Sequence, residues 1–155
     1  MMKPSRKMAQ EEAYKILKEG KYGVLSMSTK EGSPYGVPIN YFYIPTENAL
    51  YFHCFIKGRK VDYLKENNRV SFVVVGDKEI IPERFVTHYE SVIVTGLAHF
   101  ITDRAEKTKR LIQLCQALAP ESTKRRDEVI EKELSAVMIV KVDILEINGK
   151  RNRDE

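Results

Sequence analysis

The chain has 155 residues, of which 43% are hydrophobic and 31% charged. This composition excludes a disordered tail and a fibre. A domain of this length buries roughly 70% of the surface that its unfolded chain would expose, so we expect one domain over residues 1–155 rather than two marginal ones. The 26 basic and 22 acidic side chains give a net charge of +4, which favours an anionic partner only weakly.

The sequence also limits the cellular location that we expect. No apolar stretch approaches the ~20 residues of a membrane helix, and the amino-terminal residues lack the apolar core of a signal sequence. Cys54 and Cys115 have neither C-x-x-C spacing nor the number that a disulfide framework requires. We therefore predict a cytoplasmic protein that does not bind a membrane.

The predicted elements follow from the period of the apolar residues, which is near 3.6 in a helix and near 2 in a strand. In chain order they are a helix over residues 8–20, strands over 22–28, 35–44 and 49–55, a short helix over 57–67, strands over 70–75 and 89–100, helices over 103–118 and 123–134, and a strand over 137–147. Gly20 suits a left-handed cap at the end of the first helix. Asp103, with Glu106 three residues later, resembles the capping box that begins a helix.

Three segments depart from a simple pattern. Residues 76–88 have no clear period and contain Pro82, so we interpret them as a long connection. Pro38 lacks the amide proton that a ladder needs, so strand 35–44 should lie at an edge, or be bulged or interrupted there. Residues 148–155 read as a charged tail. About six strands with hairpin-scale loops and a few helices indicate a mainly β, antiparallel barrel with helices at its ends.

The most informative local feature is the basic turn Lys57-Gly58-Arg59-Lys60, which follows a strand and begins the predicted short helix. Cations at a helix start oppose the helix dipole unless an anion is bound there. Arg59 and Lys60 would grip a phosphate, and Gly58 would let the backbone approach it. A solvated basic turn explains the same residues, and spacing alone does not decide between the two.

Other chemistry-bearing residues give weaker signals. His53, His88 and His99 have no ligand-like spacing, so we predict no metal site. The eight Tyr and six Phe could line a pocket, stack on bases or fill a barrel, and core filling is the default. The cations of residues 124–126 have acidic neighbours, which favours a solvated face over a nucleic-acid patch. We therefore expect no nucleic-acid partner.

Several short motifs nevertheless occur in the order and spacing of one known family. The most specific are G-V-P-x-N-Y at residues 36–41, F-H-C at 52–54 with G-x-K at 58–60, and Y-E-S-V at 89–92. As an ordered set they resemble the pyridoxamine 5'-phosphate oxidase-like split barrels that bind FMN, in the branch similar to nitroimidazole-resistance proteins. The resemblance covers about residues 20–150 of the chain.

The resemblance implies a homodimer of six-stranded antiparallel split β-barrels, with FMN in clefts at the subunit interface. The isoalloxazine would lie along residues 37–40, and Arg59 and Lys60 would hold the phosphate. The segment with Tyr89 and Ser91 would reach the partner's flavin, and Lys150 matches a family lysine in a Gly-Lys ending. The implied cofactor-binding residues are Val37, Pro38, Ile39, Asn40, Phe52, His53, Arg59, Lys60, Tyr89, Ser91 and Lys150.

The same resemblance implies an FMN-dependent oxidoreductase that passes hydride from a reduced nicotinamide donor to a small oxidised substrate, such as a nitroaromatic. His53 matches a histidine near the flavin and is the candidate for substrate contact or proton donation. The chain lacks the Arg-rich ending of true pyridoxamine phosphate oxidases, so vitamin B6 oxidation is not expected. The alternatives are a non-catalytic flavin or haem carrier or sensor, with His53 as an axial ligand, and, with less support, a small nucleic-acid-binding barrel.

Overall fold

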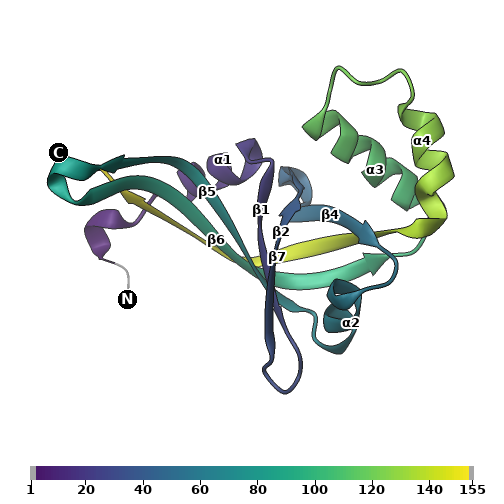
Figure 1. The fold of residues 1–155 in the computed structure, drawn as a ribbon, viewed down its shortest axis with the longest axis horizontal. Helices are drawn as coiled ribbons and strands as arrows, with labels where there is room; N and C mark the ends of the chain where they lie inside the picture. Colours follow the sequence, from purple (N-terminus) through teal and green to yellow (C-terminus); the bar gives the residue numbers. More distant parts are fainter. Residues whose placement is uncertain (1–2, 154–155) are drawn as a thin grey trace.

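The computed structural model describes residues 3–153. Helices and strands alternate in short runs along the chain (Figure 1). In chain order the elements are η1 (Pro4–Arg6), α1 (Gln10–Glu19), β1 (Tyr22–Ser28), β2 (Pro34–Asn40), β3 (Phe42–Ile44), η2 (Pro45–Glu47), β4 (Ala49–Phe55), α2 (Arg59–Glu66), β5 (Arg69–Ile81), η3 (Pro82–Arg84), β6 (Val86–Ile101), α3 (Arg104–Leu118), α4 (Arg126–Glu133), η4 (Leu134–Ala136) and β7 (Val137–Asn152). No helix within these residues is long and apolar enough to span a membrane.

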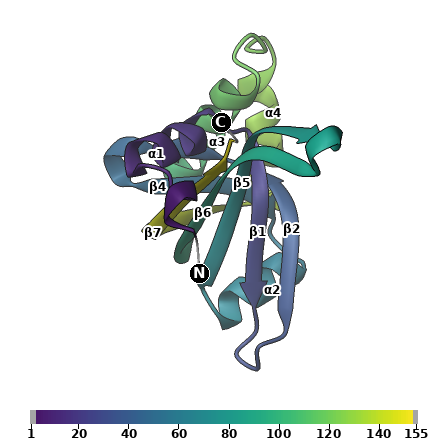
Figure 2. The same cartoon turned by 90° about the vertical axis from the view of Figure 1, so that its left-hand side faces the viewer.

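The strands of residues 3–153 form one antiparallel sheet of seven strands, in the order β2-β1-β5-β6-β7-β4-β3. The strands at the two ends of this order, β2 and β3, are separated in the chain by Tyr41 alone. The sheet must therefore curl until its ends approach each other, which Figures 1 and 2 show. This confirms the predicted fold class, an antiparallel split barrel with helices, although the strand count is seven rather than six.

The extra strand arises because the predicted strand over residues 35–44 breaks at Tyr41. The Tyr41 amide donates to the Lys21 carbonyl at 3.1 Å, and its hydroxyl donates to the Leu17 carbonyl at 2.5 Å. Its ring packs edge-on against Phe72, with the ring centroids 4.9 Å apart. Tyr41 is thus fixed inside the barrel at the corner where the chain leaves β2 and enters β3.

Residues 76–88 are not the long connection that their sequence indicates. Here β5 and β6 continue as a paired hairpin, joined by η3, and form an arm that projects from the body (Figure 1). The register shifts between Val75 and Lys78, so the period of two is lost in the sequence. At the turn, Phe85 adopts φ 52° and is 97% exposed.

The predicted charged tail over residues 148–155 is also wrong for most of its length. β7 continues through residue 152 and pairs with β6 as far as Tyr89 opposite Asn152. This part of β7 tolerates polar side chains because its backbone hydrogen bonds to β6, rather than apolar packing, hold it in the sheet. Residues 154–155 of the predicted tail lie outside the described residues.

The first helix packs on the sheet through its apolar stripe, with Ala13 and Leu17 buried. Gly20 is not the left-handed cap that the sequence predicts, because its φ of −66° and ψ of 151° are extended. A Cβ atom at Gly20 would lie 2.3 Å from the Tyr41 hydroxyl oxygen. The glycine is therefore needed for the close approach of the Tyr41 side chain.

Two apolar clusters lie on opposite faces of β4. The cluster inside the curled sheet includes Leu25, Tyr41, Leu50, Phe52, Cys54, Phe72, Val92, Val94, Val140 and Val142. The cluster beneath α3 and α4 consists of Phe42, Ala49, Tyr51, Leu111, Leu114, Ile130, Leu134 and Ile139. Successive side chains of β4 therefore point alternately into the barrel and toward the helical pair.

The packing inside the barrel leaves no room at Gly23 of β1. A Cβ atom there would lie 2.5 Å from Cε1 of Phe72 and 2.6 Å from the carbonyl oxygen of Val73. Gly36 of β2 differs, because its nearest neighbour would be Oγ of Ser26 at 3.7 Å. The two glycines have opposite tolerance for a methyl group.

An ion network fastens α3 to the sheet. The helix begins as the sequence predicts, with a carboxylate oxygen of Asp103 accepting from the Glu106 amide at 2.9 Å. Arg110 is only 5% exposed, and its guanidinium donates to Glu106 at 2.9 Å and to Glu47 at 3.0 Å. It also lies 4.3 Å from the centroid of the Tyr51 ring, and the Tyr51 hydroxyl donates to Glu47. Burying this cation requires these partners.

Candidate functional site

The start of α2 presents an open backbone. Gly58 has φ 139°, a conformation that residues with side chains rarely adopt, and no atom lies within 4 Å of the position its Cβ would take. The residue at the N-cap of α2 is this glycine, so it supplies no side-chain hydrogen bond to cap the helix. The unmatched N–H groups at the start of a helix attract anions. The donors of this turn therefore suit an anionic group such as a phosphate.

Three cations surround this helix start. Lys57 and Arg59 are exposed and Lys60 is half-buried, and no acidic side chain within residues 3–153 forms an ion pair with any of them. The Arg59 guanidinium lies 5.0 Å from the centroid of the Tyr35 ring, which in turn lies 5.4 Å from the Tyr63 ring. Stacking on Tyr35 holds Arg59 beside β2.

The strand β2 is an edge of the sheet, as Pro38 predicts, and it pairs with β1 alone. Val37 and Ile39 pack partly against the core, whereas Pro38 and Asn40 are exposed. The Asn40 amide donates to the Lys21 carbonyl at 3.1 Å, which fixes its side chain. The four predicted residues therefore lie along a strand whose outer edge has no strand partner among residues 3–153.

His53 lies on the face of β4 that carries Tyr51, and it reaches the surface beyond the cluster beneath α3 and α4. Partial burial of the imidazole, and then the positive charge of Lys60, lower the pKa of His53 below its ordinary value of 6.5. The lowered pKa favours the neutral form of the imidazole at pH 7. Phe52 and Cys54 point to the other face and are buried in the barrel. Phe52 is fully covered, so any contact from it to a cofactor is limited to its backbone.

A second group of predicted residues lies on β6 and β7. Ser91 is the register partner of Lys150, and the Lys150 ammonium lies 5.7 Å from the centroid of the Tyr89 ring. These three side chains are brought together, but toward the arm and away from α2, which carries Arg59 and Lys60 (Figure 1). One chain therefore contains two separate halves of the predicted cofactor site.

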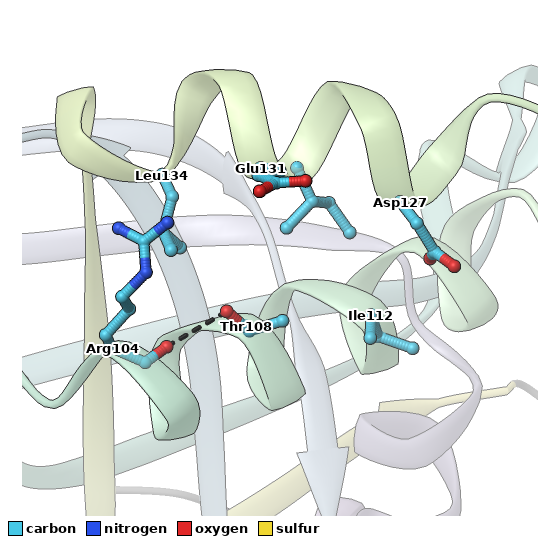
Figure 3. A pocket seen from close by; sticks show the side chains of 7 residues that line it. Arg104, Thr108, Ile112, Asp127, Glu131 and Leu134 are labelled. Atoms are coloured by element: carbon cyan, nitrogen blue, oxygen red, sulfur yellow. Dashed lines mark hydrogen bonds between the residues drawn. The ribbon is translucent and has the colours of Figure 1, made fainter.

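Two features of the surface were not predicted. One is the stacking of Arg59 on Tyr35. Its only signal in the sequence is the aromatic residue directly before the G-V-P motif, which is a weak one. A groove of about 400 Å³ between α3 and α4 is lined by Arg104, Thr108, Ile112, Asp127, Ile130, Glu131 and Leu134 (Figure 3). It contains none of the predicted site residues. Within residues 3–153, no three His, Cys, Asp or Glu side chains gather as a metal site would require.

An antiparallel sheet that curls without closing, with a cationic helix start beside an edge strand, defines this protein as a split barrel. The family model described as pyridoxamine 5'-phosphate oxidase matches residues 9–151. The chain therefore belongs to the pyridoxamine 5'-phosphate oxidase family, which confirms the family that its motifs predict. A comparison with curated proteins found no match.

Solved structures share the fold over nearly the whole chain. A protein provisionally assigned as a 5-nitroimidazole antibiotic resistance protein, from Bacteroides thetaiotaomicron, has a TM-score of 0.76 and 22% identity, covering 94% of this chain and 86% of its own. An FAD-binding protein from Mesorhizobium loti has a TM-score of 0.70 and 22% identity, covering 96% and 98%. A flavocytochrome from Azotobacter vinelandii has a TM-score of 0.80 and 21% identity, covering 99% and 73%. At these identities the likeness establishes the fold alone.

Proposed function

We propose that this protein is an FMN-dependent oxidoreductase that reduces small oxidised substrates, such as nitroaromatics, with a reduced nicotinamide donor. The observation that carries the proposal is the group of unpaired cations at the uncapped start of α2, beside the free edge of β2. This arrangement has the chemistry of a phosphate site. Membership of the pyridoxamine 5'-phosphate oxidase family supports a flavin as the molecule that carries the phosphate.

The residues of the chain have separate tasks in this proposal. Arg59 and Lys60 would hold the phosphate, and the outer edge of β2 around Pro38 would face the flavin ring. A bound FMN would supply the hydride-transfer chemistry between the donor and the substrate. The lowered pKa of His53 favours its neutral imidazole, which has one nitrogen that accepts a hydrogen bond and one N–H that donates, so it would be able to contact the substrate through either.

The same proposal includes a homodimer with FMN at the subunit interface. Val24, Val73 and Ile93 are opposite one another on β1, β5 and β6, and Val24 and Ile93 remain 42% and 44% exposed. An apolar row across a sheet favours a protein partner. A second copy packed here would bring its own Tyr89 and Lys150 toward the flavin of the first. Sedimentation equilibrium should give twice the chain mass for the wild type and a shift toward one chain mass for Ile93→Asp.

Titration of the purified protein with flavins tests the function. We expect quenching of FMN fluorescence with an affinity at least about tenfold above that for riboflavin, because riboflavin lacks the phosphate that a charge-assisted contact holds. Oxidation of a reduced nicotinamide by the FMN-loaded protein should then depend on a nitroaromatic acceptor. Equal affinity for FMN and riboflavin would overturn the phosphate site, and FMN binding without turnover would overturn the enzyme.

The second candidate is a carrier or sensor that binds flavin or haem without turnover. Its support is the neutral imidazole of His53 at the surface, together with the fold shared with the flavocytochrome. A haem spectrum that is lost in His53→Ala would favour it.

A cytoplasmic location also remains a proposal, supported by Cys54 and Cys115, both of which are free thiols.

A further inference from the structure

A second cavity, of about 690 Å³, lies between the end of α3, the loop of residues 119–125 and α4. Its volume falls within the range of small-molecule sites, about 300–1,000 Å³. His53 of β4 lies at its border, and its apolar wall is formed by Leu114, Cys115, Leu118, Ala119, Val129 and Ile130. Val129 of α4 is 47% exposed. The wall is therefore apolar but not covered by the chain itself.

The rim of this cavity is cationic. Lys124, Arg125 and Arg126 line it, together with one acidic residue, Glu121. Arg126 is neutralised by Asp127 at 3.0 Å, but within residues 3–153 neither Lys124 nor Arg125 has an ion pair. Arg125 is also the residue before the first turn of α4, where no side chain caps the helix. The self-neutralised face that the sequence indicates is thus present at Arg126 alone.

We propose that this cavity binds a small organic anion with an apolar body. The aliphatic wall would cover the body, and the unpaired cations of Lys124 and Arg125 would hold the anionic group at the rim. The neighbouring groove between α3 and α4 is lined by two carboxylates, Asp127 and Glu131, and one cation, Arg104 (Figure 3). The charges therefore favour an anion in the cavity that Lys124 and Arg125 line rather than in this groove.

The proposed anion site is distinct from the phosphate site at the start of α2. The two sites adjoin: His53, which the proposed function assigns to substrate contact, borders the cavity, and the charge of Lys60 lowers the pKa of its imidazole. The anion site itself depends on other side chains, Lys124 and Arg125, and does not require FMN to be bound. It is tested on the protein without flavin, so the two proposals succeed or fail separately.

The probe is the fluorescent apolar anion 8-anilinonaphthalene-1-sulfonate, displaced by decanoate or by decylammonium, which has the same chain and the opposite charge. We expect decanoate to displace the probe from the folded protein at concentrations at least about tenfold lower than decylammonium. The double variant Lys124→Gln and Arg125→Gln should raise the decanoate requirement by about 3- to 10-fold, the effect of two exposed ion pairs. Val129→Glu should raise it as well, by repulsion at the wall.

The matched control removes two cations from α3 and α4 outside the cavity, as Lys109→Gln with Lys132→Gln, and should leave displacement unchanged. Equal potency of decanoate and decylammonium, or equal loss in both double variants, would overturn the inference. Arg59→Ala should keep decanoate binding while it weakens FMN binding. If the protein binds decanoate but not FMN, the proposed anion site stands and the proposed oxidoreductase function is refuted. If it binds FMN but not decanoate, only the proposed anion site is refuted.

Discussion

Replacement of Arg59 by alanine should weaken FMN binding without affecting the fold. Arg59 is exposed and forms no ion pair within residues 3–153, and its described contact is with the Tyr35 ring, 5.0 Å from the guanidinium. A hydrogen bond to a charged group contributes about 1.5–3 kcal/mol. Because solvent screens an exposed contact, we expect a smaller effect, about 1–2 kcal/mol, or roughly a 5- to 30-fold rise in the FMN Kd.

Fluorescence titrations with FMN and with riboflavin separate the phosphate from the ring. Arg59→Ala should raise the Kd of FMN and leave that of riboflavin almost unchanged. Lys65→Ala is the matched control, because Lys65 is an exposed cation in the last turn of the same helix. An equal loss of FMN affinity in the Lys65 variant, or an equal loss of riboflavin affinity in the Arg59 variant, would refute the assignment of the phosphate to the helix start.

Three further predictions concern stability. In a denaturant titration, Arg110→Met should lower the free energy of unfolding by about 2–3 kcal/mol, because it leaves partly buried carboxylates without their cation. Arg126→Met at the surface should lower it by only about 0–1 kcal/mol. Similar losses in the two variants would contradict the role of the ion network. Because the folded-state pKa of His53 lies below 6.5, its protonation opposes folding, so stability should fall as pH drops through 6.5 and fall less steeply in His53→Gln. An identical pH profile would exclude this contribution. Gly23→Ala should cost about 1–3 kcal/mol by overpacking, and Gly36→Ala should be tolerated, which thermal unfolding of both variants checks.

The order of helices and strands is predictable because the apolar period is strong wherever an element covers the core. The period fails in the arm, where the bulge between Val75 and Lys78 breaks the alternation of β5. It fails differently at Tyr41, because a buried tyrosine continues the apolar pattern across the corner between β2 and β3. The local pattern of apolar residues indicates which face of a strand packs on the core. It does not indicate where the chain leaves one partner strand and pairs with another.

The cationic helix start is visible in the sequence because Arg59 and Lys60 conflict with the local helix dipole, and such conflicts point to function. The separation of these cations from Lys150 is not visible, since it depends on how the sheet curls. The cavity beside His53 is also invisible, because α3, α4 and β4 contribute to it from distant parts of the chain. Sequence motifs therefore identify which residues belong to such sites, but they do not show which of these residues lie together in the fold.

Equilibrium dialysis against FMN, followed by the visible absorption spectrum of the retained protein, tests the phosphate-anchored flavin site most directly. We predict a yellow protein that retains one FMN for each chain and releases most of it when Arg59 and Lys60 are both replaced by alanine. A wild-type protein that stays colourless after dialysis against FMN, or a double variant that retains FMN as well as the wild type, would contradict it.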